Sequence, residues 1–402
     1  MKSEQANFDE VAMNDKYLKK DVINSKTVKN MQFAKPYFQF SAACAGCAET
    51  TYIKLLSQMV GDRMYAGNAA GCSSAISGGA PILPYCKDSQ GRGPAWEHSL
   101  FEDNAEFAYG FFHAQDAIRK ELLIRLESMK DADIAPAEIE DYINNWNDGE
   151  KSRAVSDALI AALEKCEQTE DVSYILENRE YLSKKSIWAI GGDGWAYDIG
   201  FGGVDHALAS GENINILVFD TEVYSNTGGQ ASKASNIGQV AQFAAAGKEV
   251  KKKSLAEIAM QYGYVYVAQV AMGANPAQTL KAITEAEAYH GPSLIIGYSP
   301  CEMHSIKKGG MQNCQAEMKK AVECGYWNLF RFNPEAAAGK KFSLDSKEPA
   351  GGYQEFLMNE ARYASLTRSF PERAEELFKE NEQAAMDRYQ HLLKLKTVYN
   401  EA

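Results

Sequence analysis

The stretch that decides the fold reads Ile187-Trp-Ala-Ile-Gly-Gly-Asp-Gly-Trp-Ala-Tyr-Asp-Ile-Gly-Phe-Gly-Gly203 and resumes as Asn215-Ile-Leu-Val-Phe-Asp-Thr-Glu-Val-Tyr-Ser-Asn-Thr-Gly-Gly229. Residues 187–190 form a short apolar run that two glycines follow, which predicts a buried parallel strand. Residues 199–209 have helical spacing, and residues 214–219 form a second apolar run. The stretch therefore predicts strand, glycine turn, helix and strand. Polar groups follow both strands, at the sheet edge where open parallel sheets bind ligands.

The glycine turn has the composition of a phosphate site. Three glycines within residues 191–194 allow backbone N–H groups to approach phosphate oxygens, and the following helix directs its positive end toward them. Asp193 offers a carboxylate, Thr221 a hydroxyl group and Val223 a backbone carbonyl, an oxygen set suited to Mg²⁺. A Gly-Asp-Gly turn alone is equally typical of a tight strand-to-helix turn capped by Asp193. Combined with residues 220–226 after the second strand, it favours a diphosphate held through a hard cation.

Length and composition exclude several classes of partner. The chain has 402 residues, of which 45% are hydrophobic and 24% are charged, and these values are ordinary for a globular protein. The formal net charge of −12 argues against nucleic acid or an anionic membrane as a partner. No apolar run approaches the roughly 18 residues of a membrane span, and the polar residues 1–10 lack the pattern of a signal peptide. We therefore expect a cytoplasmic protein that binds neither nucleic acid nor a membrane.

The rest of the chain divides into segments of different character. Residues 1–30 are polar and lack periodicity, as in a linker or an arm. Residues 31–335 alternate strand and helix patterns and predict an α/β fold with a doubly wound, mostly parallel sheet. Within them, residues 130–185 are acidic and helix-rich, which predicts a helical insertion. Residues 336–402 are expected to form a helical carboxyl-terminal extension with a break at Pro371.

Two Ser-x-x-Glu capping boxes predict where helices begin. Ser99 and Glu102 form the first box, and Ser254 and Glu257 form the second. An aromatic strand is expected at residues 33–40.

The eight cysteines are expected to be reduced thiols or metal ligands, because the chain shows no export signal. Cys44 and Cys47 form a Cys-x-x-Cys pair at the start of a predicted helix. Cys72 stands in a turn of small residues, and Cys301 directly follows a predicted strand. Zinc or a thioredoxin-like redox pair are alternatives for the Cys-x-x-Cys motif, although zinc ordinarily needs a second close pair. Cys301 is expected at the same sheet edge as Asp193, so an iron–sulfur cluster assembled there would lie beside the phosphate site.

Four further cysteines lack such a context and are expected to be ordinary thiols. They are Cys86, Cys166, Cys314 and Cys324.

Several motifs of the chain resemble pyruvate:ferredoxin (or flavodoxin) oxidoreductase. Besides the central stretch, they are Phe38-Gln-Phe-Ser-Ala-Ala-Cys-Ala-Gly-Cys47, Gly71-Cys-Ser-Ser74, Gly91-Arg-Gly-Pro-Ala-Trp96, Ser99-Leu-Phe-Glu-Asp-Asn-Ala-Glu106, Tyr298-Ser-Pro-Cys301 and Gly325-Tyr-Trp-Asn-Leu-Phe-Arg331. The resemblance covers roughly residues 30–400 and corresponds to the carboxyl-terminal thiamine diphosphate-binding region of that large enzyme. It implies thiamine- and iron–sulfur-dependent oxidative decarboxylation of pyruvate with coenzyme A, which yields acetyl-CoA and CO₂ and reduces ferredoxin or flavodoxin.

The resemblance also implies which residues hold the cofactors. The implied thiamine contacts are Glu49, Cys72, Gly192, Asp193, Gly194, Trp195, Thr221, Glu222, Val223, Tyr224, Ser225 and Asn226, of which Asn226 also faces the substrate. The implied metal ligands are Asp193, Thr221 and Val223 for Mg²⁺, and Cys44, Cys47, Cys72 and Cys301 for one 4Fe–4S cluster. Ala48 departs from the pattern, because many members carry glycine there. Alanine would strain the cysteine loop if that position needs a positive φ.

Parts that this activity needs in the family are not evident in the chain. The resemblance implies a second domain whose carboxylate activates the aminopyrimidine, a domain with two further clusters, and a coenzyme A region. We therefore expect the chain to act with further domains or subunits, in a homodimeric assembly. Alternatives are another 2-oxoacid:ferredoxin oxidoreductase subunit, a thiamine-dependent decarboxylase or ligase without a cluster, and a non-catalytic assembly module that holds a cluster or zinc. His98, His206 and His304 are expected to be structural rather than catalytic.

Overall fold

The computed structural model describes residues 2–8, 10, 27–78 and 83–401. Much of the arm predicted for residues 1–30 lies outside these described residues. The strands are β1 (Met64–Asn68), β2 (Ala95–His98), β3 (Ser186–Gly192), β4 (Asn215–Asp220), β5 (Tyr266–Val270), β6 (Ser293–Tyr298), β7 (Phe330–Phe332) and β8 (Phe342–Leu344). They form one sheet in the order β2-β1-β3-β4-β6-β5-β7-β8. The first six strands in this order are parallel and the last two are antiparallel, which confirms the predicted mostly parallel α/β sheet.

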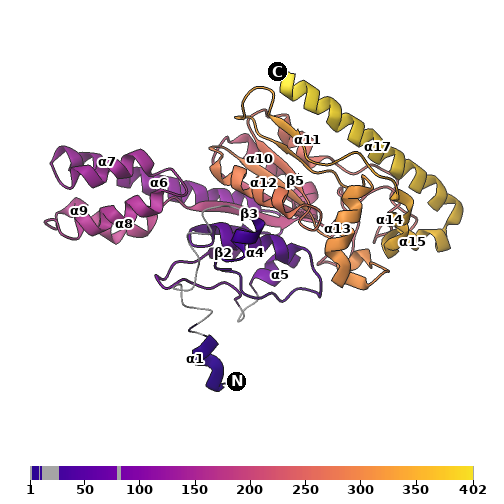
Figure 1. The fold of residues 1–402 in the computed structure, drawn as a ribbon, viewed down its shortest axis with the longest axis horizontal. Helices are drawn as coiled ribbons and strands as arrows, with labels where there is room; N and C mark the ends of the chain where they lie inside the picture. Colours follow the sequence, from indigo (N-terminus) through magenta and orange to yellow (C-terminus); the bar gives the residue numbers. More distant parts are fainter. Residues whose placement is uncertain (1, 9, 11–26, 79–82, 402) are drawn as a thin grey trace.

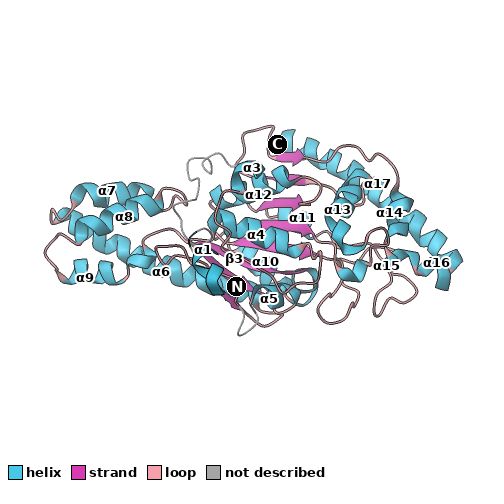
Figure 2. Cartoon of the chain, turned by 60° about the horizontal axis from the view of Figure 1, so that its bottom comes forward, coloured by secondary structure: helices cyan, strands magenta, loops and turns pink. Residues whose placement is uncertain are grey.

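Helices surround the sheet (Figures 1 and 2). They are α1 (Gln5–Phe8), α3 (Val28–Met31), α4 (Glu49–Val60), α5 (Cys72–Ser77), α6 (Asn104–Asp131), α7 (Pro136–Asn145), α8 (Ser152–Leu163), α9 (Glu170–Glu177), α10 (Phe201–Ala209), α11 (Leu255–Met260), α12 (Pro276–Ala288), α13 (Cys314–Glu323), α14 (Tyr353–Asn359), α15 (Ala361–Ala364), α16 (Leu366–Ser369) and α17 (Pro371–Glu401). Shorter helical turns are η1 (Lys2–Glu4), η4 (Arg179–Tyr181), η5 (Gly194–Ile199), η6 (Glu302–His304) and η7 (Gly310–Asn313). Every residue of β4 and β6 is buried, so both faces of the sheet centre are covered.

The register of the central strands determines where the site lies. Gly192 at the end of β3 lies beside Phe219 of β4, and Asp220 at the end of β4 lies beside Tyr298 of β6. Because the three strands are parallel, the segments that follow them leave the sheet at one edge. The sequence predicted these strands because each is a nearly continuous apolar run.

The helices after α6 have a hydrophobic core of their own. Leu126, Tyr142, Leu159 and Ile175 are completely buried in it, apart from the core beneath the sheet. In Figure 1, α7, α8 and α9 project from one end of the sheet, with α6 linking them to it. These helices occupy the segment where the sequence predicts an insertion.

The carboxyl-terminal segment includes a strand as well as helices. Phe342 of β8 stacks on Phe330 of β7 at 5.4 Å between ring centroids, and Tyr399 of α17 packs against Phe342 at 6.2 Å. A strand of three residues is too short to show periodicity, which is why only helix was predicted there. The predicted break at Pro371 is confirmed, because α16 ends at Ser369 and α17 begins at Pro371.

The two predicted capping boxes have different outcomes. The Ser254 hydroxyl accepts a hydrogen bond from the Glu257 backbone N–H at 3.4 Å, which confirms the second box. The first box is wrong, since α6 begins at Asn104 and the Ser99 hydroxyl instead donates to the adjacent carbonyl of Leu100 at 2.8 Å. The Asn104 side chain donates to the carbonyl of Ile190 at 3.1 Å, a contact with β3 that local sequence does not reveal.

Two further observations concern whole segments. The strand expected at residues 33–40 is reduced to one bridge, between Phe38 and Tyr85. Within the described ranges, none of the helices is both long and apolar enough to cross a membrane.

Candidate functional site

The structure brings the predicted Mg²⁺ ligands together at the carboxyl edge of the sheet. Asp193 is completely buried in the turn after β3. Its Oδ1 accepts hydrogen bonds from the Thr221 backbone N–H at 3.1 Å and from the Thr221 hydroxyl at 2.8 Å. The same hydroxyl oxygen lies 2.9 Å from the carbonyl oxygen of Val223. A carboxylate, a hydroxyl and a carbonyl therefore converge from the loops after two adjacent strands.

The oxygens of this set lie around one hydroxyl group. The hydroxyl of Thr221 lies within hydrogen-bond distance of Asp193, of the Val223 carbonyl and of the Ser225 hydroxyl at 2.8 Å. Its single proton serves one of these oxygens at a time, while Asp193 also accepts from the Ser232 hydroxyl at 2.6 Å and the Val223 carbonyl from the Ser225 hydroxyl at 3.4 Å. The chemistry of the set, a carboxylate, a hydroxyl and a carbonyl, fits Mg²⁺.

Electrostatics at this edge also favour a cation. Burial, followed by the charge of Asp220, raises the pKa of Asp193 to about 7. Asp220 is itself completely buried, and burial raises its pKa against the opposing charge of Lys252, which lies 2.8 Å away. Tyr197 donates to the other side of Asp220 at 2.7 Å. Lys252 pairs with Asp220 and with Glu222 and acts on Asp193 only through its charge, so a bound divalent cation would offset the negative charge that remains at Asp193.

The glycine turn is shaped by close packing at two of its positions. A Cβ atom on Gly191 would lie 2.8 Å from the Cβ of Ala69, and one on Gly194 would lie 2.7 Å from the ring of Tyr224. At Gly192 the nearest atom would be a carbonyl oxygen 3.9 Å away, which leaves the backbone open to a ligand. The helix after the turn begins as a π-helix, η5, before α10 continues it.

The loop from Thr221 to Asn226 is held in an unusual backbone conformation. Glu222 has φ of +60°, which is uncommon for a residue with a side chain. Its carboxylate accepts hydrogen bonds from Lys252 at 2.9 Å and from Arg362 at 2.7 Å. Burial opposes ionisation of Glu222, but the charges of Lys252 and Arg362 outweigh it and lower the pKa to about 2. The implied contact residue Glu222 is therefore oriented into a buried charge network in this structure.

Sequence reasoning missed the residues that support this loop from behind. Arg362 belongs to α15, and Tyr326 donates to the same carboxylate at 2.5 Å. His304, predicted to be structural, is completely buried, and its Nε2 lies 2.7 Å from the carbonyl of Thr221. A carbonyl only accepts, so this nitrogen carries the proton. The one signal was the run Gly325-Tyr-Trp-Asn-Leu-Phe-Arg331, which the resemblance included without giving Tyr326 a role.

The other two histidines that were predicted to be structural, His98 and His206, lie apart from this loop. His206 on α10 packs edge-on against Tyr109 at 5.9 Å between ring centroids. His98 at the end of β2 is exposed and lies 4.0 Å from Glu97.

The four predicted cluster cysteines gather at the same edge. Burial, followed by the charges of Glu49 and Cys301 and by a smaller effect of Cys44, raises the pKa of Cys72 to about 12. Burial likewise raises the pKa of Cys47, with Glu49, Cys301 and Cys72 adding to it. Thiols that raise one another's pKa in this way form a set that bound iron cations would stabilise as thiolates.

These thiols do not form a closed set of ligands in the structure. Cys44 is exposed, and its hydrogen bond to Glu302 raises the pKa of the thiol. Across the described parts of the chain, no group of three or more His, Cys, Asp or Glu side chains is arranged to hold a metal ion. The cysteine loop itself is unstrained at Ala48, where φ is −76°, and the positive φ of +77° belongs to Gly46 instead.

Glu49 lies between the thiols and the oxygen set. It is the first residue of α4 and only 3% exposed, and its Oε2 has no hydrogen-bond partner among the described residues. Burial, followed by the charge of Asp193, raises the pKa of Glu49 to about 8. The field of Glu49 also acts on Cys47, Cys72 and Cys301. A buried carboxyl with an unsatisfied oxygen at this position fits a ligand contact.

Two loop residues connect the oxygen set with the cysteines. A hydrogen bond from Asn226 lowers the pKa of Cys72, and one from Ser225 lowers that of Cys301, each against the larger opposing effect of burial. Asn226 is exposed, so its amide is open to a small molecule. Trp195 is completely buried, which leaves its backbone rather than its ring for a ligand.

Comparison with known proteins places this geometry in context. Residues 178–296 match the family described as thiamine pyrophosphate enzyme, C-terminal TPP binding domain. This match includes the glycine turn and the loop after β4 but none of the four cysteines.

Relatives are similar over nearly the whole chain. A pyruvate:ferredoxin oxidoreductase of Moorella thermoacetica is 51% identical over 383 residues, which cover 92% of this chain and 32% of the relative. A pyruvate-flavodoxin oxidoreductase of Klebsiella pneumoniae is 49% identical, with the same two coverages. A mitochondrial pyruvate dehydrogenase [NADP(+)] of Euglena gracilis is 45% identical over 91% of this chain and 21% of its own length. The chain thus spans about a third or less of the length of these relatives, and the resemblance noted in the sequence is confirmed.

Proposed function

We propose that this chain, which corresponds to the thiamine diphosphate-binding region of pyruvate:ferredoxin (flavodoxin) oxidoreductases, supplies the diphosphate half of an active site that decarboxylates pyruvate oxidatively. The observation that carries the proposal is the buried oxygen set of Asp193, Thr221 and Val223, with the predicted cluster cysteines at the same edge of the sheet. Coenzyme A is the acetyl acceptor in this proposal, and ferredoxin or flavodoxin is the electron acceptor.

Within this function the oxygen set would hold Mg²⁺, and the backbone of the glycine turn would face the diphosphate. Asp193 supplies the formal charge, while Thr221 and Val223 supply neutral oxygens from the neighbouring strand. Thiamine diphosphate, when bound, supplies the carbanion that attacks the keto group of a 2-oxo acid. The chain would hold the diphosphate end of the cofactor, and the backbone at Gly192 is open enough for the diphosphate to approach it.

The cysteines would place an electron acceptor next to the cofactor. Cys44, Cys47, Cys72 and Cys301 would hold one 4Fe–4S cluster, which accepts one electron at a time when bound. Glu49 lies in the field of both the thiols and Asp193, so it would contact the cofactor between cluster and metal.

Asn226 is proposed to orient the substrate. Its side chain is exposed at the end of the loop and lies next to Cys72. The other implied thiamine contacts, Trp195, Glu222, Tyr224 and Ser225, would act through backbone groups or by shaping this loop. Pyruvate is proposed over other 2-oxo acids because the relatives carry that name.

The chain would form only one side of the site. Glu49 is the first residue of α4, and Asp193 follows β3 in the same domain. The carboxylate that activates the aminopyrimidine would therefore come from another domain or subunit. In this proposal residues 31–335 form the cofactor domain, 130–185 its insertion and 336–402 an extension, and the complete enzyme is a cytoplasmic homodimer.

Calorimetry on the anaerobically purified chain tests this function. Thiamine diphosphate should bind with Mg²⁺ and lose most of its affinity when Mg²⁺ is removed. The purified protein should also show broad absorbance near 400 nm (roughly, for an iron–sulfur cluster) that dithionite bleaches. Binding that is absent, or independent of Mg²⁺, would contradict the proposed role of the oxygen set.

A further inference from the structure

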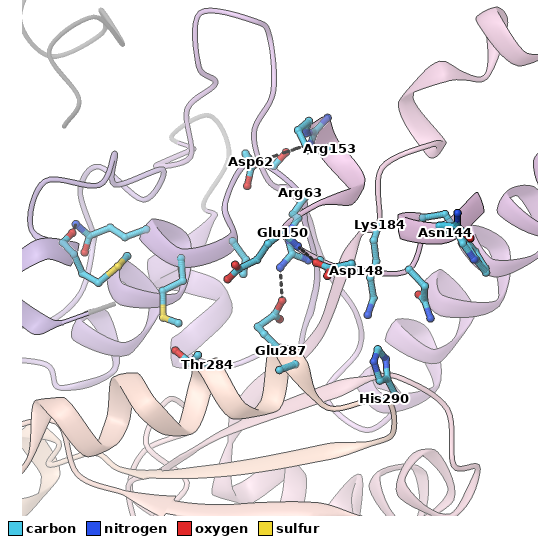
Figure 3. Close-up of a pocket in the computed structure, with 18 of the residues that line it drawn as sticks. Asp62, Arg63, Asn144, Asp148, Glu150, Arg153, Lys184, Thr284, Glu287 and His290 are labelled. Atoms are coloured by element: carbon cyan, nitrogen blue, oxygen red, sulfur yellow. Dashed lines mark hydrogen bonds and ion pairs between the residues drawn. The ribbon is translucent and has the colours of Figure 1, made fainter. Parts of the chain in front are cut away.

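A second pocket lies at the opposite edge of the sheet, where the strands begin. Its volume is about 1080 Å³, and it is lined by the end of α4, the segment between α7 and α8, and the end of α12. Arg63 and Lys184, which precede β1 and β3, both line it, as Figure 3 shows. A smaller cavity of about 210 Å³ shares Trp146, Asn147, Lys184 and His290 with this pocket. The two hollows therefore meet at the junction between the helical insertion and the sheet.

Three cationic side chains line the smaller cavity. They are Arg119 on α6 and the consecutive residues Lys184 and Lys185. Arg119 is 6% exposed and Lys184 is 8% exposed. Within the described residues none of the three forms an ion pair with an acidic side chain. Arg119 instead donates to the carbonyl of Trp146 and lies over its ring, while Lys185 lies over the ring of Tyr65.

The three cations also repel one another. Burial is the main cause that lowers the pKa of Lys184 to about 8 and that of Lys185 to about 8, and the charge of Arg119 contributes to both shifts, with Glu287 opposing at Lys184. The Nε of Arg119 is buried and has no hydrogen-bond partner among the described residues. Uncompensated positive charge in a buried place is costly, and a bound anion would remove that cost.

The acidic groups near Lys184 are engaged elsewhere. Glu287 forms an ion pair with Arg63 at 2.6 Å and also accepts from the indole of Trp188 at 3.1 Å. Asp148 accepts from the backbone N–H of Lys151 at 3.0 Å and lies 3.4 Å from its ammonium group.

Other acidic side chains that line the two cavities also lie close to basic side chains. Asp62 pairs with Arg153 at 3.6 Å, and Asp116 pairs with Lys120 at 2.6 Å. Glu212 lines the smaller cavity and Glu150 lines the larger pocket, and the charges of Glu287 and Asp148 act on Lys184 in the direction that raises its pKa. In the described part of the chain, none of these acids forms an ion pair with Lys184.

Lys184 is aimed into the shared part of the two hollows. Figure 3 shows its side chain extending toward His290 across the pocket. His290 and the amide of Asn147 add groups that can donate to an acceptor there. We propose that this junction is a binding site for a small dianion, of the size and charge of a phosphate group, held by Lys184, Lys185 and Arg119. The site is separate from the thiamine site, because it lies where the strands begin rather than where they end.

Inorganic phosphate and sulfate are the probes for this site. Calorimetry and thermal unfolding of the purified chain, in buffer free of other dianions, should show saturable binding of both with a rise in unfolding temperature. Lys184→Met should weaken phosphate affinity at least about tenfold, because it removes a charge-assisted hydrogen bond. Lys379→Met is the control, since this exposed lysine of α17 pairs with Glu375 on the same helix, and it should leave affinity unchanged.

A second variant separates this site from the diphosphate site. Asp193→Ala should retain phosphate binding, because Asp193 lies at the other edge of the sheet. If phosphate bound at the glycine turn instead, its affinity would change in Asp193→Ala and would stay the same in Lys184→Met. Without anions, Lys184→Met should be at least as stable as the unmodified chain, because it removes an uncompensated buried charge. Unchanged phosphate affinity in Lys184→Met, or a large loss of stability without anions, would overturn the proposal.

Discussion

Arg362 on α15 donates from Nη1 to Oε2 of Glu222 at 2.7 Å, although 140 residues separate them in the sequence. Both side chains are buried, with exposed fractions of 2% and 0%. Glu222 stands between Thr221 and Val223 and has the unfavourable φ of +60°. The ion pair therefore stabilises a strained residue between two proposed Mg²⁺ ligands, so the carboxyl-terminal helices position the cofactor loop.

Arg362→Met tests this positioning role. The variant breaks two buried ion pairs, because Arg362 also pairs with Glu360 at 2.7 Å, while Glu222 keeps Lys252 as its one remaining cation, so the free energy of unfolding should fall by about 3 kcal/mol. Affinity for thiamine diphosphate with Mg²⁺ should fall as well, because the loop is released. Urea unfolding and calorimetry measure the two effects. Arg368→Met, at an exposed position on α16, is the control, and equal behaviour of both variants would contradict the role of Arg362.

Asp193→Ala should abolish Mg²⁺-dependent binding of thiamine diphosphate. Asp193 is the carboxylate of the oxygen set, and the other two groups are neutral. Iron content should stay at about four atoms per chain, the value for one 4Fe–4S cluster. Calorimetry and an iron assay measure these quantities, and Asp387→Ala on α17 is the control. Unchanged cofactor affinity in Asp193→Ala would refute the metal assignment.

Replacement of Cys72 or Cys301 by serine should remove most of the cluster, because each thiolate contributes a bond and a charge. Cys166→Ser should retain it, since Cys166 lies after α8 and its thiol contacts the carbonyl of Ala162 at 3.4 Å. Iron analysis and absorbance spectra of anaerobically purified protein are the measurements. Equal iron content in all three variants would show that the ligands are other residues.

Lys184 should make stability depend on pH in the absence of anions. Its pKa is lowered to about 8 by burial, with Arg63 and Arg119 acting in the same direction and Glu287 and Asp148 opposing. The unfolded chain binds more protons than the folded chain above that pKa, so the free energy of unfolding rises with pH. Between about pH 8 and pH 9.5 this group alone should add up to about 2 kcal/mol.

Urea unfolding of the unmodified chain and of Lys184→Met measures this effect as a difference. Comparing the two removes the contributions of other titrating groups. A difference that does not change over this pH range would contradict the buried, charged position of Lys184.

The sequence predicted the parts of the site that follow the central strands. Asp193 and Thr221 were predictable because consecutive apolar runs imply neighbouring parallel strands, whose ends meet at one edge. The gathering of Cys72 and Cys301 followed from the same argument together with the resemblance.

The support behind the loop was not predictable in this way. Arg362 and Tyr326 carry no local pattern, and only tertiary packing places them against Glu222. The basic junction around Lys184 was likewise missed, because two consecutive lysines ordinarily indicate a solvated turn. Burial, rather than residue type, distinguishes that site.

The surface next to the oxygen set carries exposed apolar groups. Phe243 is 93% exposed and has φ of +67°, a strained conformation for an aromatic residue. It shares a hollow of about 380 Å³ with Val223 and with Met303, which is 46% exposed. An exposed aromatic side chain at the rim of a ligand site is typical of a surface that a partner covers. In the proposed function, the partner that covers this surface is the domain or subunit that faces the diphosphate side.

The isolated chain should therefore bind its cofactors without turning over pyruvate. In the proposed function the facing domain supplies the other side of the cofactor site, and Glu49 begins α4 on the diphosphate side, so the carboxylate that activates the aminopyrimidine is expected from that domain. Mixed with the remaining domains or subunits, the chain should reduce ferredoxin or methyl viologen when pyruvate and coenzyme A are present. Phe243→Ser should keep thiamine diphosphate affinity but require a higher concentration of these partners for the same rate. Rapid, coenzyme A-dependent reduction by the chain alone would refute the half-site, and it would mean that the described residues supply both sides of the cofactor.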